Sequence, residues 1–595
     1  NQGVTRITGA GTRDDITVPS NTVLAIDGIL VSDHHLDEDR VFATATGSKI
    51  LMEGLLQNVE LIGNLHLGRV IVDGTSFAPS LWFSGTSEVY GRIDMLNDAW
   101  WTNAGGITTM FPGSSVHMQG TRDMRIMYGA ELAFESGSEV HGAAPRKIIV
   151  NNLCTLRIKE GAKVNIDTEV EVLSGGVLII EDTATVRIAR LKVDSLGQFI
   201  VEPGAHVTFG NGNVTMNGIM QAVGLSNRRI TFSADLNQHC FFDMSNHNYM
   251  GGRTRILAQG NTFPLNPLGL QASVRVEYAN FKNVSLEMQN ITKDPIRFCE
   301  FSAHTQNPVN GATNVWTTQP FMLSSFTTMT PAGMVPTGYD QLIVESSRFA
   351  DSAGVSITYG PFPGNVYFPG YQRYIVSGIN TSGHTLCDVS SSHFQALNIG
   401  ILSTSATTDL EQNTFNDLDR GVIIIGGMTR MCQNETFTVE TAVSVTGANT
   451  GRYFDNEFHS SRTAVTISNS LTQAFRGNQF IEYYRGIVVS NATAALTAVG
   501  LNATDPSRER FGRNTFNVSD PAMFVPPPSP PLPAPQIPST HPNVFMRREN
   551  AGYTGDQLTH SDLWEELPGG VFPVSYTHLR AHETKANLVC RLLLE

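Results

Sequence analysis

The chain of 595 residues is poor in cysteine and in charged side chains. Its six cysteines form no Cys-x-x-Cys pair, which leaves zinc and thioredoxin-like sites with little support. Charged residues make up 16% of the chain and hydrophobic ones 41%, so extended disorder is not expected. No apolar run approaches the roughly 20 residues that span a bilayer. The net charge of −14 disfavours a partner bound through nucleic-acid phosphates.

Helix-type periodicity is also missing. The 54 glycines and the many Ser, Thr and Asn residues indicate strands and turns instead. We expect the cysteines to be buried apolar fillers, with one or two disulfides as the alternative. They are Cys154, Cys240, Cys299, Cys387, Cys432 and Cys590.

One repeat family runs from Leu81 to Phe209. Each copy alternates apolar and polar residues, turns at Gly or Pro and alternates again, as in Leu156–Ile166. The small residue after the turn recurs in steps of 27, 24, 24, 22 and 21, at Ser87, Ser114, Ser138, Ala162, Ala184 and Ala205.

A second family follows in the C-terminal half. A Phe, often preceded by Asn, recurs in steps of 21, 22, 21 and 22, at Phe394, Phe415, Phe437, Phe458 and Phe480. We expect the rings of Phe415, Phe437, Phe458 and Phe480 to stack inside the molecule. An Asn at a fixed place suits left-handed backbone and can hydrogen-bond along a column, so Asn413, Asn456 and Asn478 are interpreted as a structural ladder.

These steps predict a solenoid, because one coil cannot bury its apolar face alone and stacked coils can. The expected fold is all-β, a right-handed parallel β-helix with coils of about 21–24 residues. An immunoglobulin-type sandwich array is the alternative, but its units of roughly 100 residues have no place for so short a step. The Leu-rich consensus of leucine-rich repeats is absent.

The pattern resembles the right-handed parallel β-helix superfamily of pectate lyases, polygalacturonases and many bacterial surface proteins. Gln198–Phe232 is most similar to coils of its secreted bacterial members. The resemblance covers residues 20–520 and implies the fold, while the same fold carries both enzymes and adhesins.

The predicted organisation follows from composition. A lead-in at 1–20 precedes the β-helix at 21–520, whose irregular spacing predicts inserted loops at 305–340, 355–380 and 491–510. A Pro-rich linker follows at 521–542 and a truncated C-terminal module at 543–573.

The last 22 residues, 574–595, resemble a translated sequencing adapter. VSYTHLRAHE and LVCRLLLE both match adapter and primer reading frames without a break. We therefore expect no function from this segment, and we expect the native chain to end elsewhere.

No catalytic motif of the superfamily is found in order. Arg157-Ile158-Lys159 precedes any partner, Asp14-Asp15 lies near the start, and His384 stands in Gly-His-Thr. No catalytic residue is therefore assigned, although carboxylates from different coils could still pair.

Cation ligands are similarly weak. The acidic and His-containing stretch 33–39, and His239-Cys240 with His247, are interpreted as solvated loops. Asp409, Asp417 and Asp419 flank one coil and could hold calcium, but turn residues are the favoured interpretation. Neither a metal nor a cofactor is predicted.

Aromatic residues carry the functional expectation. Trp82, Trp100 and Trp101 are candidates for exposed rings that stack on sugars, and irregular loops gather the predicted glycan site: Trp316, Tyr359, Tyr367, Tyr371 and Tyr374. We expect an extracellular or cell-surface bacterial scaffold, non-catalytic and without a membrane span, that contacts glycans or cell-surface material. A polysaccharide lyase or glycoside hydrolase is the alternative.

Overall fold

In the computed structural model, most of the described residues lie in β-strands, which pair in parallel throughout the large sheet. The described residues are 2–7, 14–32, 39–74, 80–142, 145–210, 214–234, 241–243, 248–250, 254–259, 273–289, 292–303, 321–327, 341–351, 376–459, 463–470, 473–481, 485–490, 515–518, 544–547 and 564–566. Within them there is no helix, and so none that could cross a membrane. The predicted fold class is confirmed, since parallel strands stack as a β-solenoid of about 16 turns.

The chain divides into two compact units, which are described separately. Unit 1 is Asn1–Phe242 with Tyr249–Cys299, and unit 2 is Asp243–Asn248 with Glu300–Glu595. A small sheet of β27 (Phe241–Asp243) and β28 (Asn248–Met250) stands apart from the solenoid strands.

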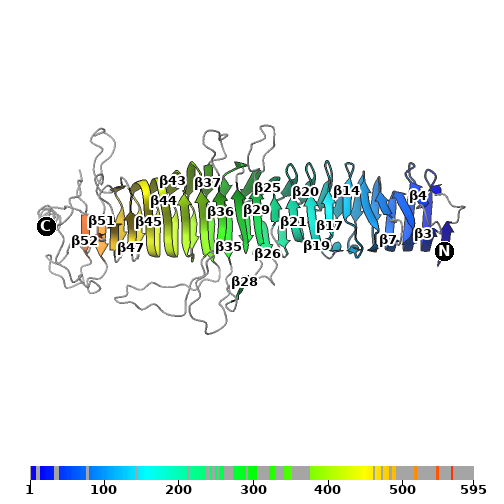
Figure 1. Cartoon of the computed structure of the whole chain (residues 1–595), viewed down its shortest axis with the longest axis horizontal. Coiled ribbons are helices and arrows are strands. Elements are labelled where there is room, and N and C mark those ends of the chain that lie inside the picture. Colours follow the sequence, from blue (N-terminus) through cyan, green and yellow to red (C-terminus); the bar gives the residue numbers. More distant parts are fainter. Residues whose placement is uncertain are drawn as a thin grey trace, which may run out of the picture. The chain divides into compact units, whose positions relative to one another are not determined.

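Strands of unit 1 stack in three columns, each strand pairing with its equivalent in the next coil (Figure 1). The β9 column holds β9 (Thr86–Val89), β12 (Ile107–Met110), β15 (Glu131–Phe134), β18 (Thr155–Ile158), β20 (Val177–Ile180), β22 (Gln198–Val201), β25 (Ile219–Val223) and β30 (Ser273–Glu277), with β33 (Thr292–Lys293) and β34 (Ile296–Arg297) paired to β30. The β10 column holds β10 (Arg92–Asn97), β13 (Ser115–Met118), β16 (Glu139–Gly142), β19 (Lys163–Val172), β21 (Thr185–Val193), β23 (His206–Phe209), β26 (Ile230–Ala234) and β31 (Ala279–Lys282).

The third column and the first coils complete the unit. The β8 column holds β2 (Asp15–Thr17), β4 (Asp39–Ala43), β6 (Val59–Gly63), β8 (Ser80–Phe83), β11 (Trp100–Ala104), β14 (Met124–Met127), β17 (Lys147–Val150), the second halves of β19 and β21, β24 (Val214–Met216), β29 (Thr254–Gln259) and β32 (Val284–Gln289). The β9 and β10 columns begin together in the long strands β1 (Gln2–Ile7), β3 (Val23–Ser32), β5 (Lys49–Gln57) and β7 (Leu65–Gly74).

Successive side chains along these strands point to opposite faces, so that one set lies in the core and the other faces solvent. The small residues of the first repeat lie inside the corners, each at most 3% exposed: Ser87, Ser114, Ser138, Ala162, Ala184 and Ala205. The residue before each of the last five has left-handed backbone, supplied by Gly113, Gly137, Gly161, Thr183 and Gly204. A small side chain is needed here because the chain turns directly over the corner of the coil below.

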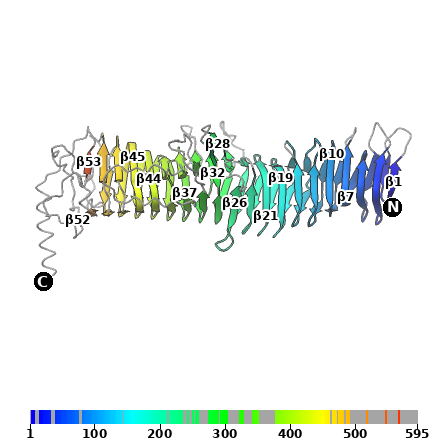
Figure 2. The ribbon, with the colours of Figure 1, turned by 90° about the horizontal axis from the view of Figure 1, so that it is seen from below.

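Unit 2 has the same three-column construction, and successive strands lie side by side along each unit in a second view (Figure 2). The β41 column holds β35 (Glu300–Ala303), β38 (Arg348–Asp351), β41 (His393–Gln395), the start of β44 (Thr414–Cys432), the start of β45 (Glu435–Phe454), β46 (Glu457–His459), β49 (Gln479–Ile481), β51 (Thr515–Val518) and β52 (Val544–Arg547).

Two further columns in unit 2 share the long strands β44 and β45. The β39 column holds β36 (Phe321–Thr327), β39 (Val376–Ser382), β42 (Ile399–Thr404), the middle of β44 and β45, β47 (Thr463–Ser468), β50 (Arg485–Ser490) and β53 (Trp564–Glu566). The β40 column holds β37 (Gln341–Glu345), β40 (Leu386–Ser390), β43 (Thr407–Glu411), the ends of β44 and β45, and β48 (Gln473–Arg476).

A file of aromatic rings runs through the interior of unit 2. Phe301, Phe349, Phe394 and Phe415 are buried and stack at centroid distances of 4.8, 5.0 and 4.9 Å, and Phe458 stacks on Phe480 at 5.0 Å. The expected interior position is thus confirmed for Phe415, Phe458 and Phe480, but Thr436 stands between Phe415 and Phe458 and divides the rings into two stacks.

Phe437 is the exception, and its predicted place in the stack is wrong. The residue paired with Phe415 is Thr436, which is buried, and Phe437 pairs with Asn416. Phe437 therefore points to the other face, half-exposed and stacked on His459 at 4.8 Å. A shift of one residue reverses the face of a strand residue.

The predicted Asn ladder is confirmed and has one more rung. The Nδ2 groups of Asn413, Asn434 and Asn456 each donate to the Oδ1 of the next Asn at 2.9 Å, and the ladder ends at Asn478. All four side chains are at most 1% exposed. The left-handed backbone expected at the Asn lies instead at the residue before it, at Gln412, Gln433, Asp455 and Gly477.

Four cysteines lie in the described part of the chain, and no disulfide joins them to one another. Cys154, Cys299 and Cys387 are buried, as expected of apolar fillers, and Cys432 is half-buried. Several predicted segments lie outside the described residues, namely the linker 521–542, the loop 491–510 and the adapter-like tail 574–595 with Cys590. Strands β36, β52 and β53 lie inside ranges predicted as a loop or a separate module.

Candidate functional site

The glycan site predicted from the loops lies outside the described residues. This applies to Trp316, Tyr359, Tyr367, Tyr371 and Tyr374. His239, Cys240 and His247 also lie outside them, as does the stretch 33–38. These remain predictions, and the candidate surfaces below are built from described residues.

Tryptophans of the β8 column divide between the core and the surface. Trp82 and Trp100 point outward and are half-exposed. Trp101, expected to be exposed, is instead 1% exposed, because it follows Trp100 on the inward side of β11. Its ring packs on Phe83 at 4.3 Å and its Nε1 donates to Asn103 Oδ1 at 2.6 Å.

An outward-facing pair of rings spans the β8 column. Trp82 on β8 stacks against Tyr128, which follows β14, with centroids 6.4 Å apart and planes inclined by 25°. Strand β11 lies between β8 and β14. Tyr128 is 69% exposed, and its left-handed backbone turns the chain at the end of β14. The pair thus presents ring surface outside the core, Trp82 from a strand and Tyr128 from the turn that follows one.

Arginine side chains surround the third outward ring. The guanidinium carbons of Arg122 and Arg125 lie 4.4 and 5.5 Å from the Trp100 ring centroid. Cation–π contacts of this kind are worth about 0.5–1 kcal/mol at exposed sites, so they hold the ring in place. Arg122 also lies 3.9 Å from Asp98, at a distance where an exposed ion pair contributes little.

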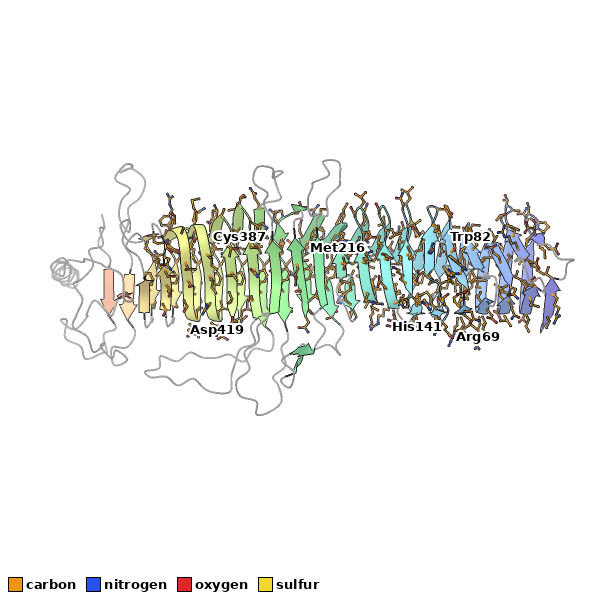
Figure 3. All side chains as sticks on the ribbon, viewed as in Figure 1. Arg69, Trp82, His141, Met216, Cys387 and Asp419 are labelled. Carbon is orange, nitrogen blue, oxygen red and sulfur yellow. The ribbon has the colours of Figure 1, made fainter. Side chains whose placement is uncertain are left out.

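We call Trp82, Trp100, Arg122, Arg125 and Tyr128 the aromatic surface. Figure 3 labels Trp82 on the edge of unit 1 opposite His141. The Nε of Arg125 is buried and has no hydrogen-bond partner among the described residues. Apolar ring faces beside hydrogen-bond donors are what a pyranose ring needs, because its C–H face is apolar and its edge carries hydroxyls.

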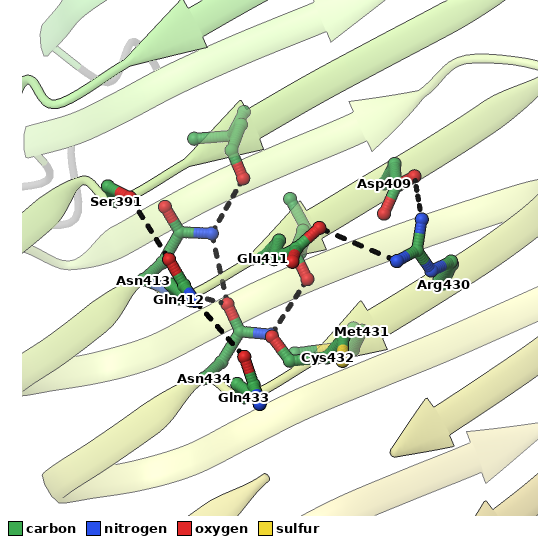
Figure 4. Close-up of polar contacts among 12 residues, drawn as sticks. Ser391, Asp409, Glu411, Gln412, Asn413, Arg430, Met431, Cys432, Gln433 and Asn434 are labelled. Atoms are coloured by element: carbon green, nitrogen blue, oxygen red, sulfur yellow. Dashed lines mark hydrogen bonds and ion pairs between the residues drawn. The ribbon is translucent and has the colours of Figure 1, made fainter. Parts of the chain in front are cut away.

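A carboxylate pair on unit 2 is the other candidate. Asp388 on β40, Asp409 on β43 and Arg430 on β44 occupy equivalent positions in successive coils. Arg430 bonds Asp409 Oδ2 at 3.0 Å and Glu411 Oε2 at 3.4 Å, as Figure 4 shows. The backbone of neighbouring coils is separated by roughly 4.8 Å, the spacing of paired strands.

Both aspartates have raised pKa values. Burial is the largest cause for Asp388, followed by the negative charges of Asp409, Glu345 and Glu411. Burial also raises the pKa of Asp409, although Arg430 acts in the opposite direction. The Oδ1 of Asp409 is buried without a hydrogen-bond partner in the described part of the chain. Such a pair can place a protonated carboxyl next to an ionised one.

The three aspartates considered as calcium ligands, and His384, do not come together in one site. Asp409 lies on the β40 column, whereas Asp417 is a residue of left-handed backbone within β44 and Asp419 accepts from Asn398 at 2.6 Å. The described residues contain no group of three or more His, Cys, Asp or Glu side chains that could hold a metal ion. His384 is 1% exposed and bonds Thr381.

Arg157, from the stretch that looks like a polygalacturonase motif, pairs with carboxylates of neighbouring coils. Its Nε lies 2.8 Å from Glu131 and its NH1 2.6 Å from Glu181. This side chain therefore joins coils on the outside of unit 1.

Comparison of the chain with protein-family models, with curated proteins and with solved structures finds no match in any of the three.

Proposed function

We propose that this chain is a non-catalytic bacterial β-helix scaffold, secreted or displayed at the cell surface, that contacts glycans through the aromatic surface. The observation that carries the proposal is the exposed Trp82–Tyr128 ring pair, two coils apart on one face of unit 1. Rings held two coils apart by the paired strands β8, β11 and β14 keep a fixed spacing, which suits a repeating polymer. The loop residues around Tyr367 and Tyr371 are proposed as a further contact region of the same function.

The chemistry favours stacking with flanking hydrogen bonds. A sugar seated on Trp82 and Tyr128 would lie beside the guanidinium groups of Arg122 and Arg125, which carry only donors and so bond hydroxyl oxygens or acidic groups. Each ring contributes on the order of 1 kcal/mol, so useful affinity requires several rings acting together. An extended solenoid provides such repetition along its length.

Glycan binding should be lost in steps when the rings are removed. We expect Trp82→Ala and Tyr128→Ala each to weaken binding roughly fivefold, and the double variant roughly 30-fold, at about 1 kcal/mol per ring. The full chain on a neutral and acidic glycan array identifies the ligand, and titration of that ligand gives the ratios. Tyr90→Ala is the matched control, because Tyr90 is 51% exposed and stacks on Phe111 elsewhere on unit 1. A wild type that binds no glycan, or a double variant that binds as the wild type does, would refute the proposal.

A polysaccharide hydrolase is the second candidate, favoured by the raised pKa values of Asp388 and Asp409. Retaining hydrolases hold their two carboxyl groups roughly 5–5.5 Å apart, close to the strand spacing that separates these coils. Asp388, with the more acidic surroundings, would be the general acid, and Asp409 beside Arg430 the ionised partner.

If this activity exists, Asp388→Asn should reduce the cleavage rate roughly 100-fold or more, because the variant cannot donate a proton. Activity of the wild type should fall as the pH rises through the raised pKa of Asp388, since the acid must be protonated. Reducing-end assays on a panel of acidic and neutral polysaccharides measure both, with Asp419→Asn as the control carboxylate. Absence of cleavage across the panel eliminates this candidate and leaves the scaffold proposal.

A further inference from the structure

A histidine pair lies on the outside of unit 1, on the β10 column. Asp94, His117 and His141 occupy equivalent positions on β10, β13 and β16. The two imidazole rings lie 4.6 Å apart with planes inclined by 37°. His117 is half-buried and forms no hydrogen bond to another described residue.

A depression of about 240 Å³ opens beside the two rings. It is lined by His117, His141, Gln119, Gly120 and Arg146, with Met118 and Gly142 completing its wall. The absence of a side chain at Gly142 keeps the depression open, and its absence at Gly120 lets neighbouring coils approach closely. A Cβ at Gly142 would lie 2.8 Å from Met118 Cε and 3.3 Å from Arg146 Cβ, and one at Gly120 would lie 1.8 Å from Asn97 O. We call this depression the histidine pocket.

Donors outnumber acceptors among the side chains of this pocket. Arg146 uses its Nε to bond Gly120 O, and no further hydrogen bond joins its guanidinium to a described residue. The nearby carboxylates are already engaged, including Asp167, which pairs with His141 across β16 and β19 and accepts from Arg187 NH1 at 3.0 Å. Arg92 binds Asp94 through two nitrogens at 2.7–3.0 Å, and His141 Nε2 lies 2.9 Å from Glu139 Oε2.

We propose that the histidine pocket binds an oxyanion, a sulfate or phosphate group, through Arg146 and the imidazoles of His117 and His141. A guanidinium is the side chain best suited to a planar or tetrahedral oxyanion, and imidazolium N–H groups add charge-assisted bonds. A cation is disfavoured, since Arg92 and Arg146 flank the rings. The site is separate from the aromatic surface, which lies on the β8 column, so it does not depend on glycan binding there.

Binding should strengthen as the pH falls. The pKa of His117 is lowered by burial first, then by the charges of Arg92 and His141, while Asp94 and Glu139 act in the opposite direction. An anion in the pocket stabilises the protonated ring of His117 and so opposes this lowering of its pKa. By linkage, affinity then increases as the pH drops below the ordinary His pKa of about 6.5.

Titration of the full chain, labelled with ¹³C-histidine, tests the site with inorganic sulfate and inorganic phosphate. We expect saturable shifts of His117 and His141 signals, stronger binding at acidic pH, and affinity at least tenfold weaker in Arg146→Met, a variant that preserves the side chain's apolar stem. His117→Gln is the second variant, and His206→Gln is the control, because His206 is exposed elsewhere on the same column.

The source of the oxyanion follows from a second titration with a sulfated oligosaccharide. If the oligosaccharide binds more tightly than inorganic sulfate, the ligand is a sulfate ester on a glycan. If the two bind equally, the ligand is the free anion. The proposal is overturned if neither anion shifts the two signals, if Arg146→Met binds as the wild type does, or if Zn²⁺ alone produces saturable shifts. Failure of glycan binding in the Trp82 and Tyr128 variants leaves this result unaffected, so the two proposals fail separately.

Discussion

Replacing Phe394 by alanine is expected to lower the free energy of unfolding of unit 2 by about 3–5 kcal/mol. The ring is 1% exposed and lies between Phe349 and Phe415, so its removal leaves a cavity and breaks two stacking contacts. The backbone beside the ring at Gly378 carries no side chain that could move in. A Cβ on Gly378 would already lie 3.0 Å from Phe394 Cδ1. The file of rings therefore has little means of closing the gap.

The matched control is Phe437→Ala, the same substitution on a ring outside the core. Phe437 is half-exposed and contacts His459, so we expect a loss below about 1 kcal/mol. Urea unfolding followed by circular dichroism gives the global values. Hydrogen exchange of β38, β41 and β44 shows whether the loss is local, which is necessary because repeat arrays need not unfold in one step. Equal losses in the two variants would mean that the interior file does not stabilise the unit as described.

Register is the part of the fold that sequence spacing predicted almost completely. The steps of 21–22 residues between Phe anchors correctly placed Phe415, Phe458 and Phe480 inside. Phe437 misled because it also fits the step, although it stands three residues after Asn434 while the buried rings stand two residues after Asn413, Asn456 and Asn478. The ladder fixes which residue faces inward, so the Asn-to-Phe spacing was the better guide. The same reading would have shown Thr436 in the core.

Candidate sites were harder to predict, because they arise between coils. Asp388, Asp409 and Arg430 follow one another at steps of 21 residues, and His117 and His141 are separated by 24, the steps of their own repeats. Applying those steps to charged and imidazole side chains would have found both columns. Arg146 and Tyr128 could not be found this way, since they lie beyond the strand ends, where coils differ in length. The burial of Trp101 depends on which residues of β11 face inward, and the spacing of the repeats does not determine this.

Replacing Asn434 by leucine is expected to destabilise unit 2 by at least about 3 kcal/mol. Its Nδ2 donates to Leu410 O at 2.9 Å and to Asn456 Oδ1 at 2.9 Å, while its Oδ1 accepts from Asn413 N at 3.0 Å and Asn413 Nδ2 at 2.9 Å. Leucine has similar volume and no polar atom, so Asn413 N loses its acceptor and Leu410 O loses a donor, whereas Asn413 Nδ2 keeps its bond to Val389 O and Asn456 Oδ1 keeps the one from Asn434 N. Each such group costs about 1–3 kcal/mol.

Gln433→Asn is the neighbouring control for this ladder prediction. Gln433 is exposed, has a left-handed backbone that Asn tolerates, and accepts one exposed hydrogen bond from Gln412 at 3.1 Å. We expect a change within about 0.5 kcal/mol there. The readout is urea unfolding together with exchange protection of the amides of Asn413 and Glu457, which lie one coil before and one coil after Asn434; Asn413 N donates to Asn434 Oδ1 at 3.0 Å and Glu457 N to Asn434 O at 2.8 Å. Because the Asn434 side chain bonds the Asn side chains of the coils before and after it, its removal should lower exchange protection on both sides of Asn434. Unchanged protection at Asn413, whose N–H bonds the deleted oxygen, would show that the Asn side chains fill the corner without holding the coils together.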